Sequence, residues 1–212
     1  MVPEIRLLVA VPTMGSIHPL LVSRLIRWGQ EFPNGQISFY FTFKVAPVDR
    51  ARNQIVDYFL KREPSFTHLL MIDADTIPPK DAVSRLLSHD KHIVSALTPI
   101  LRYDEKDGSW SAHDNCFTNV ERDCDDKVTK TLIAERGTGL KEILRCGASC
   151  LLIKRSVFDV IAKPYFDFIE NEDGTIHKRS EDINFCDKVR EAGISIFADT
   201  DVTCGHYKEI ML

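Results

Sequence analysis

The stretch "HLLMIDADTIPPKD", residues 68–81, joins a continuous apolar run to two aspartates that stand one residue apart. The four apolar residues at 69–72 are typical of a β-strand that is buried on both faces. Asp73 and Asp75 follow directly, and two prolines then turn the chain. Ligands of open α/β sheets bind beyond the carboxyl ends of the strands, so the acidic pair lies where chemistry is expected.

Strand and helix patterns alternate on either side of this stretch. Apolar, aromatic and β-branched runs predict strands at residues 5–11, 36–43, 67–72 and 92–99. Apolar residues at helical spacing predict helices at residues 19–28, 47–62 and 79–90. This alternation predicts an α/β fold with a mostly parallel central sheet and helices on both faces.

The alternation stops after Pro99. Residues 102–127 are polar, charged and aromatic without a clear period, which predicts an irregular excursion over the edge of the sheet. Short strands are then expected at residues 127–135 and 140–153, a helix at 156–162 and a turn at 171–175. We expect the short strands to form a small antiparallel extension in the C-terminal half.

The segment "SEDINFCDKVREAG", residues 180–193, carries the start and stop signals of a helix. Ser180 can cap it, Glu181 and Asp182 occupy the first turn, and Gly193 ends it. Acidic residues in a first turn also complement the helix dipole, so this pattern alone assigns them no chemistry.

Composition limits the class of protein. The chain of 212 residues suits one domain, and 44% hydrophobic with 27% charged residues is the balance of a soluble globular protein. The net charge of −4 argues against nucleic acid as a partner. With no signal segment and no apolar run near the roughly 20 residues of a membrane span, we expect a cytoplasmic protein. The oligomeric state does not follow from the sequence.

The six cysteines are expected to be free thiols, because a chain of this size needs no disulfides. They are Cys116, Cys124, Cys146, Cys150, Cys186 and Cys204. The CxxxC spacing of Cys146 and Cys150 lacks a second ligand pair, which favours buried strand cysteines over a metal site.

An apolar strand followed by D-x-D and a proline-containing turn resembles the metal-binding motif of GT-A fold glycosyltransferases, particularly the family 2-like nucleotide-sugar transferases. Further segments are similar to that family in chain order: "VAVPT" at 9–13, "VDRARNQIV" at 48–56, "CGASCLLIKRSVF" at 146–158, "SEDINFCDKVREAG" at 180–193 and "TCGHYK" at 203–208. The compact chain also resembles small transferases encoded by large algal viruses, which implies action in a host cytoplasm. The family's Q-x-x-R-W segment is missing after the acidic helix, so processive polymer synthesis is not expected.

The resemblance implies a single GT-A, Rossmann-like domain over residues 1–212. Residues 1–99 would hold the nucleotide, and residues 100–212 would shape the sites for the donor sugar and the acceptor. The implied reaction moves a hexose from a UDP-sugar to an acceptor hydroxyl on a glycan, with inversion favoured.

The resemblance also implies roles for single residues. Pro12 and Thr13 would lie against the uracil, Asp49 and Arg52 near the base and ribose, and Asn53 would support the loop.

Asp73, Asp75 and His206 would hold Mn²⁺ or Mg²⁺, with Asp73 also contacting the ribose or a metal-bound water. Asp182 would be the general base, its pKa raised by Glu181 or by burial.

Basic and aromatic residues complete the implied site. Lys208 and Arg102 would neutralise the diphosphate. Trp110, His113 and Phe117 could stack against a sugar or anchor the loop to the core.

Two other functions fit the same residues. The stretch "IDADT" also matches the D-x-D-x-T motif of haloacid-dehalogenase phosphatases, in which Asp73 would be the nucleophile. A degenerate domain that binds a sugar nucleotide or a glycan without turnover is the second alternative. Asp75 could also form an Asx turn or a helix cap, and the partner of His206 could be a backbone carbonyl.

Overall fold

The computed structural model describes residues 4–33, 35–63, 65–104, 108–122, 128–170 and 177–208. Cys124 and the turn expected at 171–175 lie outside these ranges.

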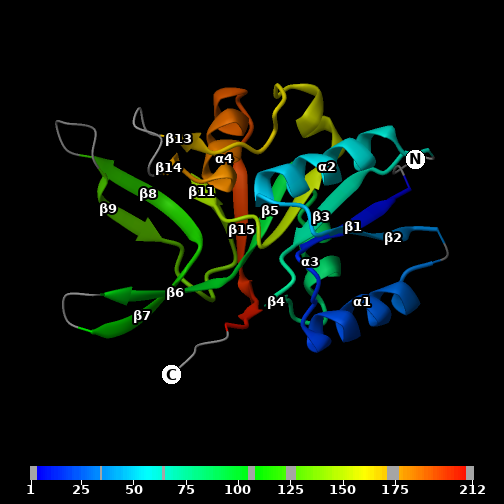
Figure 1. The fold of residues 1–212 in the computed structure, drawn as a ribbon, viewed down its shortest axis with the longest axis horizontal. Helices are drawn as coiled ribbons and strands as arrows, with labels where there is room; N and C mark the ends of the chain where they lie inside the picture. Colours follow the sequence, from blue (N-terminus) through cyan, green and yellow to red (C-terminus); the bar gives the residue numbers. More distant parts are fainter. Residues whose placement is uncertain are drawn as a thin grey trace.

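A seven-stranded sheet with the order β10-β15-β5-β12-β3-β1-β2 forms the centre of the molecule (Figure 1). Its strands are β1 (Leu7–Thr13), β2 (Ile37–Phe43), β3 (His68–Ile72), β5 (Ile93–Leu97), β10 (Leu140–Ile143), β12 (Cys150–Lys154) and β15 (Ile196–Thr203). Five strands run in one direction, while β12 and β10 run antiparallel to their neighbours. The prediction of a mostly parallel sheet is confirmed.

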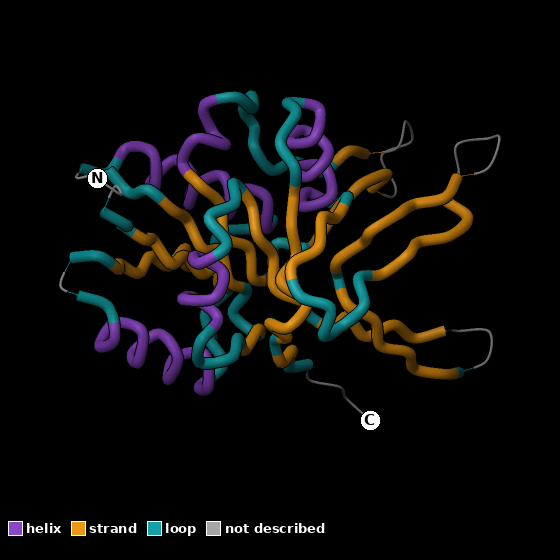
Figure 2. Tube along the Cα trace, turned by 180° about the vertical axis from the view of Figure 1, so that it is seen from behind, coloured by secondary structure: helices purple, strands orange, loops and turns teal. Residues whose placement is uncertain are grey.

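Helices cover both faces of this sheet (Figures 1 and 2). The four α-helices are α1 (Pro19–Glu31), α2 (Val48–Lys61), α3 (Ala82–Ser88) and α4 (Glu181–Glu191). One apolar cluster joins α2 and α4 to the sheet, and a second joins α1 and α3 to its other face.

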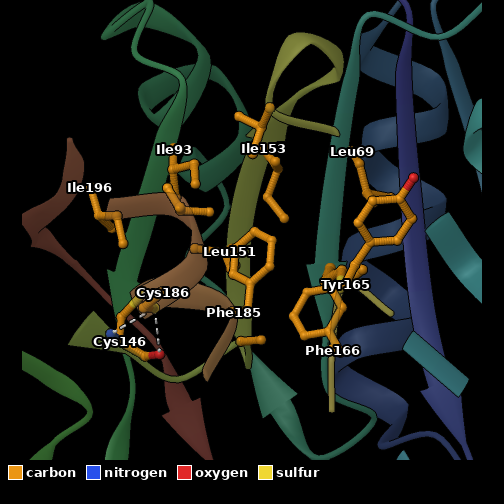
Figure 3. Close-up of a cluster of buried hydrophobic side chains, with 14 of the residues drawn as sticks. Leu69, Ile93, Cys146, Leu151, Ile153, Tyr165, Phe166, Phe185, Cys186 and Ile196 are labelled. Atoms are coloured by element: carbon orange, nitrogen blue, oxygen red, sulfur yellow. Dashed lines mark hydrogen bonds between the residues drawn. The ribbon is translucent and has the colours of Figure 1, made fainter. Parts of the chain in front are cut away.

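Strand β3 is apolar at successive positions, with no alternation of apolar and polar residues, because both of its faces are buried. Successive side chains of a strand point to opposite faces. Leu69 and Met71 lie in the cluster under α2 and α4, whereas Leu70 and Ile72 lie in the cluster over α1 and α3. All four are fully buried, and Figure 3 shows Leu69 in its cluster. The strand must therefore be apolar throughout, as the sequence predicted.

The expectation of an irregular excursion over residues 102–127 is wrong for its described part. Strands β6 (Pro99–Asp104) and β7 (Ser109–Asp114) pair antiparallel, as do β8 (Cys116–Arg122) and β9 (Val128–Ile133). Both ribbons project from the body of the molecule (Figure 1). A two-stranded ribbon with solvent beside it has no buried face to impose alternation, so the sequence pattern did not reveal these strands.

The remaining elements are short. They are β4 (Thr76–Ile77), β11 (Arg145–Cys146), β13 (Ile169–Glu170), β14 (His177–Arg179) and β16 (Gly205–His206). In place of the helix expected at 156–162 the structure has a 3₁₀ turn, η1 (Arg155–Asp159). Ser180 stands at the N-cap of α4, but its hydroxyl donates to the Asp182 carboxylate and accepts no backbone N–H of the first turn, so the expected side-chain cap is not formed. The five described cysteines are buried free thiols, as predicted.

The loop between β11 and β12 is packed tightly against Asn115. The Asn115 amide donates to Ser149 Oγ at 2.8 Å, and its oxygen accepts the backbone N–H of Thr98 at 3.0 Å. A Cβ atom added to Gly147 would lie 2.6 Å from Asn115 Nδ2. Only glycine therefore fits at position 147 without displacing this amide.

We predict that Gly147→Ala lowers the free energy of unfolding by about 1–3 kcal/mol, because the methyl group overpacks the Asn115 contact. Urea denaturation measures the change. Gly205→Ala is the matched control, since its Cβ would meet Ile77 at an ordinary 3.6 Å. Equal effects of the two substitutions would contradict the tight packing at Gly147.

Candidate functional site

A pocket of about 1010 Å³ opens beyond the carboxyl ends of β1 and β3. The starts of α1 and α2 and the segment after β15 close its sides. Its lining residues are Pro12, Thr13, Met14, Ser16, Ile17, His18, Pro19, Val45, Ala46, Val48, Ala51, Arg52, Asp73, Ala74, Asp75, His206, Tyr207 and Lys208. The structure thus brings together seven of the residues that the sequence singled out, and we call this space the donor pocket.

Backbone hydrogen bonds fix the loop that carries the two aspartates. The N–H of Asp73 donates to Ser149 O at 3.0 Å, the N–H of His18 donates to Ala74 O at 2.9 Å, and the N–H of Tyr207 donates to Asp75 O at 2.9 Å. Three separate parts of the chain therefore hold the loop, and the two carboxylates have set positions.

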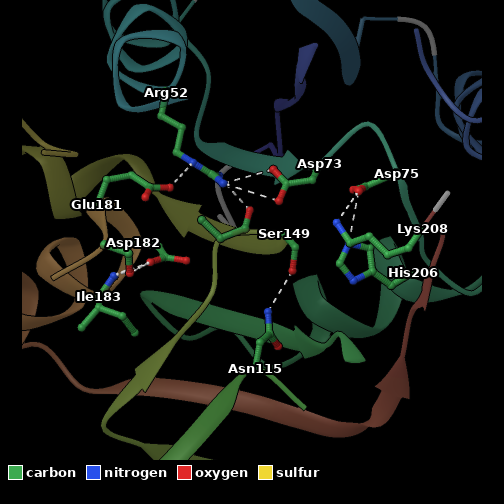
Figure 4. A network of polar contacts seen from close by, with 12 residues as sticks. Arg52, Asp73, Asp75, Asn115, Ser149, Glu181, Asp182, Ile183, His206 and Lys208 are labelled. Carbon is green, nitrogen blue, oxygen red and sulfur yellow. Dashed lines mark hydrogen bonds and ion pairs between the residues drawn. The ribbon is translucent and has the colours of Figure 1, made fainter. Parts of the chain in front are cut away.

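Arg52 lies between the two halves of the site with only 3% of its surface exposed (Figure 4). Its Nη2 is 3.1 Å from Asp73 Oδ1, its Nε is 3.0 Å from Glu181 Oε1, and its Nη1 donates to Ala148 O at 3.0 Å. The guanidinium therefore links the end of β3, the loop before β12 and the start of α4.

Burial and nearby opposite charges have opposite effects on the pKa values of Arg52, Asp73 and Glu181. Burial opposes the charge of Arg52, but the carboxylates of Asp73 and Glu181 outweigh it, and the pKa of Arg52 is raised. Burial also raises the pKa of Asp73, against the lowering effect of Arg52. Burial and the neighbouring Asp182 carboxylate raise the pKa of Glu181. The two carboxylic acids that Arg52 holds thus both have a raised pKa.

Asp75 has a different environment. Its Oδ2 lies 3.2 Å from His206 Nε2 and 2.9 Å from Lys208 Nζ. Partial burial would raise its pKa, but the hydrogen bonds from His206 and Lys208 prevail and lower the pKa to about 2. Asp75 is therefore a carboxylate near neutral pH.

The pair of Asp75 and His206 fits a divalent cation. His206 Nδ1 lies 2.6 Å from Pro99 O, which can only accept, so this nitrogen carries a proton. In the neutral imidazole, Nε2 then presents a lone pair toward Asp75 Oδ2, and either a proton or a cation between them relieves the repulsion. A carbonyl partner on the second ring nitrogen is the usual arrangement of metal-binding histidines.

Asp73 is placed differently from the expected third ligand. Its carboxylate is directed to Arg52 (Figure 4). Among the described residues no group of three or more His, Cys, Asp or Glu is gathered around one point. The assignment of Asp73 to the metal stays a prediction.

The candidate base, Asp182, lies at the start of α4 and is half-buried. Its Oδ1 accepts the Ser180 hydroxyl and the backbone N–H of Ile183. No hydrogen bond from the described residues falls on Oδ2. Asp182 is near enough to act on the pKa of both Asp73 and Glu181, although it does not line the donor pocket.

Asn53 holds the loop that contains Tyr165 and Phe166. Its amide donates to Asp49 O and Phe166 O, and its oxygen accepts the N–H groups of Tyr165 and Phe166. Asp49 Oδ1 is a buried oxygen that lacks a hydrogen-bond partner within the described part of the chain. A buried carboxylate oxygen without a donor is costly, but Asp49 is not among the described residues that line the donor pocket.

The described aromatic residues and the histidine expected on the excursion are not among the residues that line the donor pocket. Trp110 is 54% exposed on the β6–β7 ribbon, with its ring centroid 4.9 Å from that of Tyr103. His113 and Phe117 lie on β7 and β8 and are also not among the described residues that line the pocket. The side chain of Arg102 lies outside the described part of the structure.

His18 and Tyr207 are pocket residues that the sequence did not reveal. Their ring centroids lie 4.8 Å apart across the pocket wall. His18 stands at the N-cap of α1, where its Nδ1 accepts the N–H of Leu20. Its place before Pro19 indicated only a helix start, and Tyr207 had no signal beyond its neighbour His206.

No family model and no curated protein matches the chain. Solved structures do resemble it. A197 from STIV has a TM-score of 0.64 at 17% identity, over 97% of this chain and 87% of that one. GalNAc-T7, solved with UDP, GalNAc and Mn²⁺, has a TM-score of 0.55 at 11% identity, over 99% of this chain. The chain spans 45% of the GalNAc-T7 chain.

These likenesses establish a GT-A-like fold, in agreement with the resemblance of the sequence. The mostly parallel central sheet and the small antiparallel sheets of this chain match such a fold. Within the described residues, no helix has the length and apolar character needed to cross a membrane.

We predict that Arg52→Met lowers the free energy of unfolding by about 3–5 kcal/mol at neutral pH, because two carboxylates lose their buried partner. The deficit should shrink as the pH falls, since protonated Asp73 and Glu181 no longer need the guanidinium. Urea denaturation at several pH values measures both effects. Arg50→Met, on an exposed part of the same helix, should change stability by less than about 0.5 kcal/mol.

Proposed function

We propose that the protein is a metal-dependent glycosyltransferase that moves a hexose from a UDP-sugar to an acceptor hydroxyl, on a glycan. The observation that carries this proposal is the pairing of Asp75 with His206, 3.2 Å apart, in a pocket beyond the ends of β1 and β3. The GT-A-like fold supports it, because GalNAc-T7 has that fold and was solved with UDP, GalNAc and Mn²⁺.

In this proposal residues 1–99 hold the nucleotide and residues 100–212 supply the acceptor side. Pro12 and Thr13 line the donor pocket at the end of β1, where the resemblance places the uracil. The resemblance places Asp49 near the base, but Asp49 is not among the described residues that line the donor pocket. Arg52 is fully engaged by protein groups, so we assign it to positioning and not to contact with the base or ribose.

Asp75 and His206, with Asp73 beside them, would hold Mn²⁺ or Mg²⁺. When bound, such a cation would neutralise negative charge on the diphosphate leaving group. Lys208 Nζ, now 2.9 Å from Asp75 Oδ2, is half exposed and would move to contact a phosphate oxygen.

Asp182 would act as the general base. Its Oδ2 would take the proton of the acceptor hydroxyl while the acceptor oxygen bonds to the anomeric carbon. The bond from that carbon to the diphosphate breaks in the same displacement, and UDP leaves with the electron pair. Direct displacement inverts the anomeric centre. Glu181, paired with Arg52, would fix the start of α4 so that Asp182 is correctly placed.

The phosphatase alternative is disfavoured by the fold and by Asp73 itself. The solved structures that match over nearly the whole chain give a GT-A-like fold. Arg52 also holds Asp73 Oδ1 at 3.1 Å, whereas a nucleophile needs a free oxygen aimed at the substrate. A sugar-nucleotide-binding domain without turnover is separated from the transferase by the experiments below.

We predict that the protein releases UDP from at least one UDP-hexose in the presence of Mn²⁺, and that EDTA stops the release. Asp75→Ala should lower the rate about 10²-fold or more, the scale on which the loss of one electrostatic stabiliser acts. A coupled UDP assay over a panel of UDP-sugars measures this.

Asp201→Ala is the matched control for Asp75→Ala, because Asp201 is exposed and paired only with Arg85 at 3.3 Å within the described chain. Its rate should equal that of the unchanged protein. UDP release that survives EDTA would contradict the metal dependence. Cleavage of p-nitrophenyl phosphate with phosphate trapped on Asp73 would instead support the phosphatase.

We predict that Asp182→Asn lowers kcat for transfer to an acceptor by about 10²- to 10⁴-fold and leaves donor affinity unchanged, because only proton removal is lost. Calorimetry with UDP and Mn²⁺ measures the affinity. Glu191→Gln, at the exposed far end of α4, should affect neither quantity. If the unchanged protein binds donor without turnover and Asp182→Asn binds it equally, the protein is a binding domain.

A further inference from the structure

A second pocket lies on the side of α2 away from the donor pocket. Its volume is about 740 Å³, within the range of small-molecule sites. Its lining residues are Tyr40, Arg50, Asn53, Gln54, Asp57, Tyr58, Lys61, Lys163, Pro164 and Tyr165. The roles proposed above use none of these side chains except that of Asn53.

Aromatic rings and neutral polar groups form part of this second pocket. The rings of Tyr40 and Tyr58 are stacked with centroids 4.0 Å apart and an angle of 6°. The Gln54 amide donates to the Tyr40 hydroxyl at 3.1 Å. Tyr165 also lines the pocket but is only 5% exposed, so Tyr40 and Tyr58 supply the accessible rings. Flat apolar faces beside hydroxyl and amide groups suit a sugar ring, which has apolar faces and a rim of hydroxyls.

The charge of the second pocket is positive. Arg50, Lys61 and Lys163 line it against the single carboxylate of Asp57. Asp57 is shared, because it pairs with Lys163 and lies 3.8 Å from Lys61. The excess of cations stands out in a chain of net charge −4. It favours an anionic ligand.

The wall opposite α2 is held in place. Asn53 Oδ1 accepts the backbone N–H of Tyr165 at 2.9 Å, and the Lys163 ammonium pairs with Asp57 across the pocket. The Lys163 ammonium also lies 5.6 Å from the centroid of the Tyr165 ring. The pocket is therefore formed before a ligand binds, which lowers the entropic cost of binding.

We propose that this second pocket binds a saccharide unit carrying a phosphate or a carboxylate. The tyrosines and Gln54 would contact the sugar ring, and Arg50 and Lys61 would pair with the anion. This inference rests on the lining residues of the second pocket and does not depend on transferase activity.

The experiment is calorimetry on the full chain with glucose 1-phosphate and with glucuronate, alongside glucose and inorganic phosphate. At least one of the two anionic sugars should bind, and more tightly than glucose or phosphate. The substitutions Lys61→Ala, Arg50→Ala and Tyr58→Leu should each weaken binding about tenfold. Lys61 and Arg50 are exposed, so their variants keep the fold even if Tyr58→Leu does not.

Lys208→Ala is the matched control, because it removes a cation from the donor pocket and should leave binding unchanged. Loss of binding in Lys208→Ala but not in Lys61→Ala would place the ligand in the donor pocket and overturn the proposal. Equal affinity for phosphate or for glucose would also overturn it, as would no binding of either anionic sugar at about 10 mM, where a millimolar Kd would register.

Discussion

The structure depends on one buried cation. Arg52 joins Asp73, at the end of β3, to Glu181, at the start of α4, and 129 positions separate Arg52 from Glu181. Glu181, with its side chain 6% exposed, could not be buried in charged form without Arg52, because an unpaired buried charge costs several kcal/mol. Asp73 is only partly buried and gains a partner at 3.1 Å. The guanidinium also holds Ala148 O, so the loop between β11 and β12 is tied to the same point. This buried charged contact therefore joins the two halves of the chain.

This contact explains why acidic residues occur in pairs in both motifs. In each pair one carboxylate binds Arg52 and the other does not: Asp73 is held while Asp75 faces His206 and Lys208, and Glu181 is held while Asp182 is half-buried. One member fixes the backbone and leaves its neighbour available for chemistry. An apolar strand can thus end in two carboxylates, because Asp73 is paired with Arg52 while Asp75 faces His206 and Lys208.

The sequence predicted what local patterns control. Residues 69–72 had to be apolar because both faces of β3 are covered, and the ends of strands located Asp73 and Asp75. It could not reveal contacts that only folding creates. From the sequence, Arg52 is expected to be a surface charge on a helix, because its partner Glu181 is distant along the chain and only folding brings the two together. The sequence did not predict the β6–β7 ribbon, because residues such as Tyr103 and Trp110 are exposed there. Without a buried face, apolar and polar residues do not alternate along its strands.

Helix α2 shows how one element serves several sites. Successive residues of an α-helix point about 100° apart. Arg52 faces the donor pocket, Asn53 holds the loop at Tyr165 and Phe166, and Gln54 faces the second pocket. Phe166 in turn stacks on Phe185 of α4, with ring centroids 4.5 Å apart. Helix α2 therefore links both pockets to the start of α4, through the Asn53 contacts with the loop on one side and the buried Arg52–Glu181 pair on the other.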